Sequence, residues 1–172
     1  MDLTDYAATT RIAYEGDGCV IAVWQDISMG IWGKSATLPL ILELEKVREL
    51  ISSQYPKTSS VHVLVNDAGP PQPDARKKLE EITAKSEGRL IGVATVVPGA
   101  GFRVSAMRGF LTGLHWLQRR PYSARVCSSV REGAEWLAPL HSAHSVATDA
   151  GALERLLLQL CERPSVARSN AA

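Results

Sequence analysis

The chain has 172 residues, of which 45% are hydrophobic, and this length and composition suit one compact domain with a sizeable core. Nineteen lysines and arginines against eighteen aspartates and glutamates leave a formal charge of +1. This balance lacks the basic surplus of proteins that bind nucleic acid through its phosphates, so we expect no nucleic-acid partner.

The sequence also lacks the segments that direct a protein into a membrane. No apolar run reaches the roughly 18 residues of a bilayer span, and the first residues do not form a basic segment followed by an apolar one. Cys19, Cys127 and Cys161 are odd in number and far apart, which favours reduced packing residues over disulfides or a metal clip. We therefore expect a cytoplasmic protein with no membrane span, no metal and no cofactor.

The predicted elements begin with a hairpin. TRIAY, residues 10–14, and CVIAVW, residues 19–24, are strand-like runs, and Asp17 and Gly18 between them suit the positive φ angles of a tight turn. We interpret QDISMGIWGKSA, residues 25–36, as the connection that follows. Trp32 lies between glycines in this connection, which makes it a candidate for an exposed aromatic at a contact surface.

Helical and strand-like patterns then alternate along the chain. The helical segments carry apolar residues three and four apart, the strand-like segments are short apolar runs, and Ser129 and Glu132 match a helix-starting capping box. The predicted helices cover residues 37–55, 74–88, 102–119, 130–140 and 151–162, and the predicted strands after the hairpin cover 61–65, 90–97 and 124–128.

This order predicts an α/β fold. We expect an N-terminal β-hairpin followed by βα units, with packed helices on a mixed, mostly parallel sheet of four to five strands. The domain should cover residues 8–140, followed by an amphipathic C-terminal helix within 148–163 and a flexible tail over 164–172. The leucines of that helix form one apolar edge, which we expect to be buried on the domain or across a homodimer.

A glycine-rich turn lies between a predicted strand and the helix that follows it. PGAGFRVSAMRG, residues 98–109, has the context in which backbone N–H groups at a helix start bind anions. However, Gly99 and Gly101 are followed by Val104 where a dinucleotide-binding fingerprint has its third glycine, and the lysine of a P-loop is absent. We therefore expect a structural turn with a partner-facing helix start, and no nucleotide site.

Several polar side chains are candidates for contacts with a partner or an anion. The arginines after the glycine turn could pair with carboxylates or hold an anion. Other candidates lie near the carboxyl end of a predicted strand, where open α/β sheets place their ligands. The candidate residues are Trp32, Asp67, Arg76, Gly101, Arg103, Ser105 and Arg108.

Catalytic motifs are absent from the sequence. His141 and His144 are spaced as metal ligands can be, but nothing nearby completes a tetrahedral set. There is no G-x-S-x-G nucleophile elbow, and the glutamates lie on helix surfaces in charge-mixed surroundings. We therefore expect a protein that is not an enzyme.

Three segments in this order resemble the bacterial STAS-like family, which includes anti-sigma-factor antagonists of the SpoIIAA type. They are VNDAGPPQPDAR, VATVVPGAGFRVSAMRGFLTG and ARVCSSVREGAEWLAP, and the resemblance covers about residues 8–140. It implies a small α/β domain that acts by binding partner proteins. Antagonists of this type switch partners through a phosphorylated serine at the start of the helix after the third strand. Here Asn66 to Ile82 contain no serine or threonine, so the resemblance implies a module without that switch.

The expected function is therefore that of a non-enzymatic, regulatory module with a protein as its partner. Domains of related fold carry lipids, which makes the binding of a small apolar ligand or a lipid the alternative. An enclosed apolar pocket between the sheet and the helices would favour this alternative, and a solid core would count against it.

Overall fold

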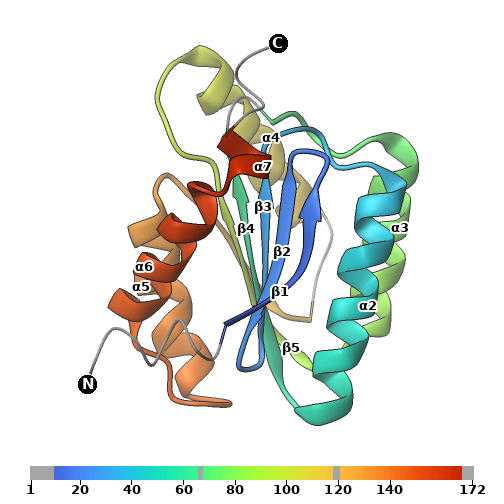
Figure 1. The fold of residues 1–172 in the computed structure, drawn as a ribbon, viewed down its shortest axis with the longest axis vertical. Coiled ribbons are helices and arrows are strands. Elements are labelled where there is room, and N and C mark those ends of the chain that lie inside the picture. Colours follow the sequence, from blue (N-terminus) through green and yellow to red (C-terminus); the bar gives the residue numbers. More distant parts are fainter. Residues whose placement is uncertain (1–9, 66–67, 118–120, 168–172) are drawn as a thin grey trace.

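The computed structural model describes residues 10–65, 68–117 and 121–167, and within these ranges six strands form one mixed sheet (Figure 1). The strands are β1 (Thr10–Gly16), β2 (Cys19–Trp24), β3 (Ile27–Trp32), β4 (Thr58–Leu64), β5 (Leu90–Val96) and β6 (Ser123–Cys127). They lie side by side in chain order. The β1–β2 and β2–β3 pairs are antiparallel, and β3 to β6 run parallel. The mixed α/β architecture is confirmed, but the sheet has six strands and not the expected four to five.

The opening hairpin forms as predicted. Gly16 pairs with Cys19, which leaves Asp17 and Gly18 as a two-residue turn. Both turn residues have positive φ, 50° and 73°, as in the type I′ turns that suit the twist of a hairpin.

The additional strand is β3, which lies in the segment that we interpreted as a connection. All six of its residues are buried, because β2 and β4 flank it and helices cover both of its faces. Ile27, Met29 and Ile31 alternate with the small residues Ser28 and Gly30, and the low β propensity of glycine made this short run resemble a connection. Trp32 at its end is only 5% exposed, so the expectation of an exposed aromatic at this position is wrong.

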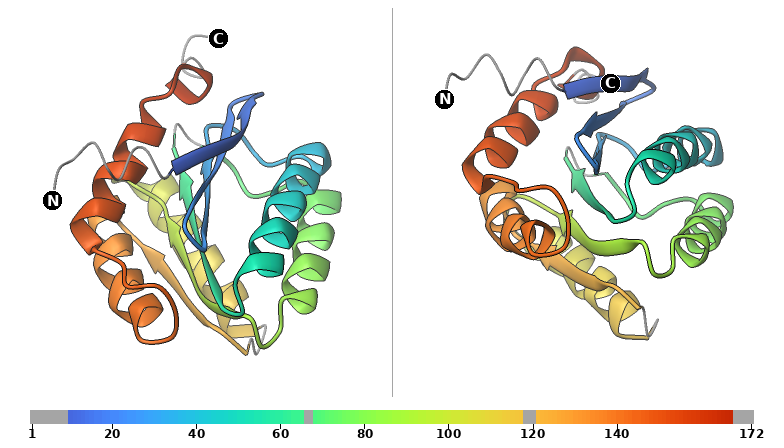
Figure 2. Two further views of the ribbon diagram at one scale, coloured as in Figure 1. Left: turned by 60° about the horizontal axis from the view of Figure 1, so that its bottom comes forward. Right: turned by 90° about the horizontal axis from the view of Figure 1, so that it is seen from below.

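Helices cover the sheet on both faces (Figure 2). They are α2 (Leu38–Gln54), α3 (Pro73–Lys85), α4 (Phe102–Leu117), α5 (Val130–Ser142), α6 (Ala150–Cys161) and the short α7 (Pro164–Ala167). Helices α2 and α3 pack on one face, α5 and α6 pack on the opposite face, and α4 lies against the edge strand β6. Among the helices in the described ranges, none is long and apolar enough to cross a lipid bilayer.

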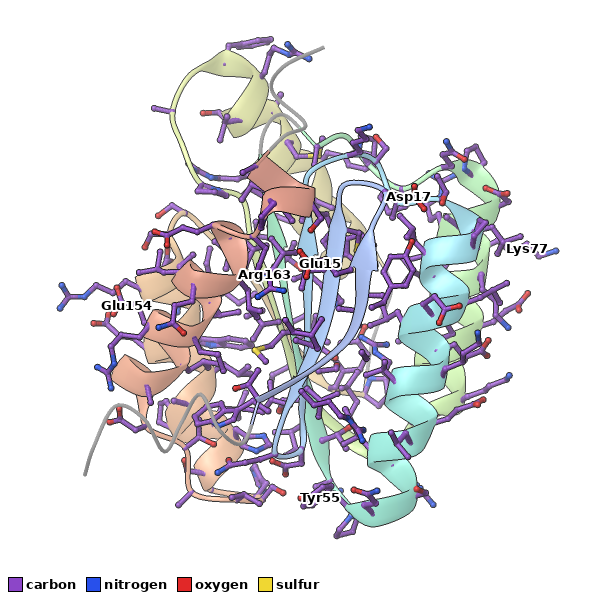
Figure 3. All side chains as sticks on the ribbon, viewed as in Figure 1. Glu15, Asp17, Tyr55, Lys77, Glu154 and Arg163 are labelled. Carbon is purple, nitrogen blue, oxygen red and sulfur yellow. The ribbon has the colours of Figure 1, made fainter. Side chains whose placement is uncertain are left out.

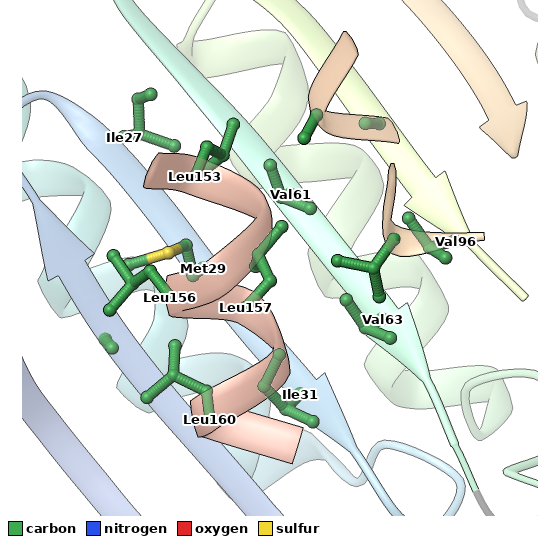
Figure 4. Packing of buried hydrophobic residues seen from close by; sticks show 14 of the residues in the cluster. Ile27, Met29, Ile31, Val61, Val63, Val96, Leu153, Leu156, Leu157 and Leu160 are labelled. Atoms are coloured by element: carbon green, nitrogen blue, oxygen red, sulfur yellow. The ribbon is translucent and has the colours of Figure 1, made fainter. Parts of the chain in front are cut away.

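The leucine edge of α6 is buried within the chain itself. Leu153, Leu156, Leu157 and Leu160 are each at most 6% exposed and pack with Met29 and its neighbours on the sheet (Figure 4). The helix therefore belongs to the main core. Of the two predicted ways to cover this edge, the structure uses the domain and not a second copy.

The chain does not become a free tail at residue 164. Val166 in α7 is fully buried, and just before this helix Arg163 forms an ion pair with Glu15 of β1 (Figure 3). Ser165 Oγ also donates to Glu15 Oε1 at 3.1 Å. The expected tail is thus wrong for residues 164–167, because one apolar side chain and one ion pair fix them to the hairpin. Residues 168–172 lie outside the described residues.

Candidate functional site

A cavity of about 160 Å³ lies between the sheet and the helices α2, α3 and α4. Its lining is mainly apolar, with a smaller number of charged and polar side chains. The lining residues are Trp32, Lys34, Ala36, Ile41, Arg48, His62, Leu64, Gly69, Pro70, Pro71, Arg76, Leu79, Glu80, Thr83, Val93, Thr95, Phe110, Leu111 and Tyr122.

The sheet forms the floor of this cavity. Paired residues of neighbouring strands share a face, and the pairs Trp32–Leu64 and His62–Thr95 bring these side chains to the α2/α3 side of the sheet. Gly30 lies opposite His62 and leaves room for the rings beside it. A Cβ at Gly30 would be 2.9 Å from the Trp32 indole, closer than real Cβ atoms come to other atoms, and in tight contact with His62 Nδ1 at 3.0 Å.

A chain of polar contacts runs from the floor to helix α2. Ser28 Oγ and Ser60 Oγ are 2.5 Å apart, and Arg48 Nη2 donates to Ser60 Oγ at 2.9 Å. The same Nη2 atom is 3.4 Å from His62 Nε2, and Trp32 Nε1 donates to His62 Nδ1 at 3.3 Å. The guanidinium of Arg48 is thereby held half-buried beside the cavity floor.

The charged residues of the lining are mostly basic. Lys34, Arg76 and Glu80 are exposed and mark the rim, whereas Arg48 lies deeper. Among the lining residues that the structure describes, three thus carry a positive charge and one a negative charge.

Helix α4 supplies the outer wall and carries apolar side chains that are not covered. Phe110 and Leu111 line the cavity, yet Phe110 is still 45% exposed. Phe102 at the start of the helix is 88% exposed. An aromatic side chain so open to water is unusual on a soluble surface and is a feature of contact sites.

The glycine turn before α4 is built as a tight backbone turn. Gly99 and Gly101 have φ angles of 102° and 106°, which favour glycine. Arg108 folds back onto this turn, where Nη2 donates to the carbonyl oxygens of Val97 and Gly99, each at 2.7 Å, and Nε donates to Val97 at 2.9 Å. The Arg108 guanidinium therefore stabilises the turn itself, while Arg103 at the same helix start is exposed.

A second polar cluster lies on the other side of the sheet, beneath α5. His141 Nε2 is 2.9 Å from Asp26 Oδ1, His141 Nδ1 is 2.8 Å from Ser59 Oγ, and Ser145 Oγ donates to Asp26 Oδ2. Serine, histidine and aspartate together are the residue types of a hydrolase triad. However, Asp26, Ser59 and His141 are each at most 1% exposed, and none of them lines the cavity. This arrangement joins β3, β4 and α5 as a buried structural network.

Burial and hydrogen bonding act in opposite directions on Asp26. Burial on its own raises the pKa of this carboxyl group, but the hydrogen bonds from His141 and Ser145 outweigh it and hold the pKa below its ordinary value. The cysteine thiols are shifted the other way, since burial raises the pKa of Cys127 and of Cys161 to about 11. Neither thiol is thus an activated nucleophile.

The structure separates the residues that the sequence suggested for binding. Trp32 and Arg76 meet at the cavity, whereas Gly101, Arg103, Ser105 and Arg108 lie at the start of α4 and do not line it. Asp67 lies outside the described residues.

Sequence reasoning missed most of the polar lining of the cavity. Arg48, His62, Thr95 and Tyr122 were not among the candidate residues. The available signal was His62 itself, a polar residue within the apolar run VHVLV.

None of the protein-family models, curated proteins or solved structures that we compared with the chain matches it.

Proposed function

We propose that the protein is a binding module that takes a small, mostly apolar molecule into the cavity between the sheet and α2, α3 and α4. The cavity is the observation that carries this proposal. Ligand sites in proteins combine a concave, mainly apolar lining with a few polar groups that orient the ligand, and this cavity has that composition. The feature expected of the ligand-binding alternative was an enclosed apolar pocket between sheet and helices; this cavity lies in that place and is partly open to solvent.

The volume indicates the size of the ligand. An engineered apolar cavity of about 150 Å³ in another protein takes up benzene, and the present cavity of about 160 Å³ is similar. A ligand with a body of this size fits better than a long lipid chain. Because the buried Ser59–His141–Asp26 network has no contact with the cavity, the proposed role is binding without catalysis.

The experiment is a thermal-shift titration with benzyl alcohol, a small neutral aromatic probe. A ligand present at ten times its Kd stabilises the native state by about 1.4 kcal/mol, which raises the Tm of a chain of this length by about 3–6 °C. Leu111→Trp should abolish the shift, because the larger side chain fills the space next to α4.

The matched control for this experiment is Leu158→Trp, which makes the same replacement at a 46% exposed position on the opposite side of the sheet. This variant should respond to benzyl alcohol as the wild type does. The absence of a shift in the wild type, or an equal shift in the folded Leu111→Trp variant, would contradict the proposal.

Binding of a regulatory protein partner is the second candidate function, in a cytoplasmic setting. The exposed aromatic side chains of α4, Phe102 and Phe110, favour it. The STAS-like resemblance of the sequence favours it as well, since that resemblance implies a domain that binds partner proteins. Three free cysteines suit a reducing compartment.

A pull-down from the native cell with a point-variant comparison tests this second candidate. Phe102→Ser should lose a protein that the wild type retains, because the exposed ring would be the main apolar contact. Leu158→Ser removes an exposed apolar side chain from another surface and should retain the same protein. If the wild type, Phe102→Ser and Leu158→Ser retain a protein equally, that protein is not bound through α4.

A further inference from the structure

We infer that the ligand of the cavity is an aromatic molecule, whose ring packs among the rings of Trp32, Phe110 and Tyr122. This inference rests on the proposed function and names the chemical class of the ligand at the same site.

Aromatic side chains gather around the cavity. Phe, Tyr and Trp make up only 6% of the chain, yet three of those that the structure describes line this one space. Trp32 comes from the end of β3, Phe110 from α4, and Tyr122 directly precedes β6. Because the fold brings these rings together from separate elements, a molecule in the cavity meets aromatic surface both on the side of the sheet and on the side of α4.

Two of the three rings are held in place by packing within the protein. Trp32 is buried in the apolar cluster beneath α2 and α3, where its ring centroid is 6.0 Å from that of His62. Tyr122 is buried against Leu90 and Val93. Side chains that are already ordered lose little conformational freedom when a ligand contacts them, so their contacts add to the affinity with a small entropic cost.

Phe110 is the ring that a ligand would cover further. It lines the cavity from α4, yet 45% of its surface is exposed. A ligand ring beside Phe110 would remove part of this apolar surface from water, which is favourable for any apolar ligand. Offset or edge-to-face packing of two aromatic rings adds an attraction between their quadrupoles, which a saturated ring cannot provide. An aromatic ligand is therefore favoured over an aliphatic one of the same size.

Calorimetric titration of the full chain with two matched ligands tests the inference. Benzyl alcohol and cyclohexylmethanol have the same number of carbon and oxygen atoms and differ in whether the six-membered ring is aromatic. The saturated ring has the larger apolar surface, so burial alone would make cyclohexylmethanol the tighter ligand. Contacts between aromatic rings reverse this order, and benzyl alcohol should bind more tightly by about 2- to 10-fold.

Phe110→Leu tests the contribution of the ring on α4. Leucine keeps an apolar side chain at the wall, so both ligands should still bind, but benzyl alcohol should lose about 2- to 10-fold in affinity relative to cyclohexylmethanol. Phe102→Leu is the matched control. It makes the same replacement on the same helix at a residue that does not line the cavity, and it should keep the wild-type ratio of affinities.

Equal affinities of the wild type for the two ligands, or tighter binding of cyclohexylmethanol, would overturn the inference and leave the proposed function intact. Binding of neither ligand would overturn both. A wild-type ratio in the folded Phe110→Leu variant would overturn the packing of the ligand ring against α4. If this variant does not fold, the comparison of the two ligands on the wild type still decides the outcome.

Discussion

Asp26 shows how the packed interior uses a charged residue for structure. Its carboxylate lies at the start of β3, is completely buried, and receives hydrogen bonds from the ring of His141 and the hydroxyl of Ser145. His141 Nε2 lies 2.9 Å from Asp26 Oδ1 and Nδ1 lies 2.8 Å from Ser59 Oγ, so both ring nitrogens have a partner within the cluster. A buried network of this kind stabilises one arrangement of the elements only while it remains complete.

The first prediction is that Asp26→Asn destabilises the protein by about 1–3 kcal/mol at pH 7, since the substitution removes an ionised acceptor from the network. The folded-state pKa of Asp26 lies below its ordinary value of 3.8, so its stabilising contribution is present above that value and is lost as the pH falls through the folded-state pKa. Urea denaturation between pH 7 and pH 3 should therefore show the wild-type and variant stabilities converging only below about pH 4.

The exposed substitution Asp74→Asn is the control and should change little at any pH in this range. Equal stabilities of the wild type and Asp26→Asn at pH 7 would contradict the role assigned to this network.

At the scale of elements, neighbouring residues of α6 differ sharply in burial. Leu157 is fully buried in the main core, whereas Leu158 is 46% exposed. The second prediction is that Leu157→Ala lowers the free energy of unfolding by about 2–5 kcal/mol, while Leu158→Ala changes it by about 0.5 kcal/mol or less. Chemical denaturation of the two variants measures both values. Similar small losses in both variants would show that α6 is not part of the core.

The start of α4 allows a second matched pair. Arg108 donates to the carbonyl oxygens of Val97 and Gly99, whereas Arg103, five residues earlier, is exposed. The third prediction is that Arg108→Ala destabilises the protein by about 1.5–3 kcal/mol and increases hydrogen exchange in the glycine turn, while Arg103→Ala does neither. If the two variants exchange equally fast, the contacts of Arg108 do not hold this turn.

Most of the elements could be predicted from the sequence because their signals are local. The hairpin depends on two turn residues, Asp17 and Gly18, and the helices on apolar residues spaced three and four apart. The strand β3 was missed for a physical reason. Its alternation of apolar residues with Ser28 and Gly30 is short and interrupted by glycine, and its partners β2 and β4 are identified only in the fold. The tail was misjudged similarly, since Val166 is fixed by contacts distant in the sequence.

At the scale of the whole molecule, the candidate site exists only because the sheet and several helices pack together. Arg48 comes from α2, His62 and Thr95 from two parallel strands, and Phe110 from α4. No local pattern links these residues, so the sequence indicated single members, Trp32 and Arg76, but not the cavity that they share. The polar residues near the glycine turn were predicted as binding candidates because their motif is local, although they do not line the cavity.

Binding of a small molecule in this cavity can be followed directly through the side-chain N–H resonance of Trp32. Trp32 lines the cavity, whereas Trp24 and Trp136 pack with the core on the opposite face of the sheet. In a ¹H–¹⁵N NMR titration with benzyl alcohol, the Trp32 indole signal, assigned with a Trp32→Phe variant, should shift and saturate while those of Trp24 and Trp136 remain in place. An unchanged Trp32 signal, or equal shifts of all three, would contradict binding in this cavity.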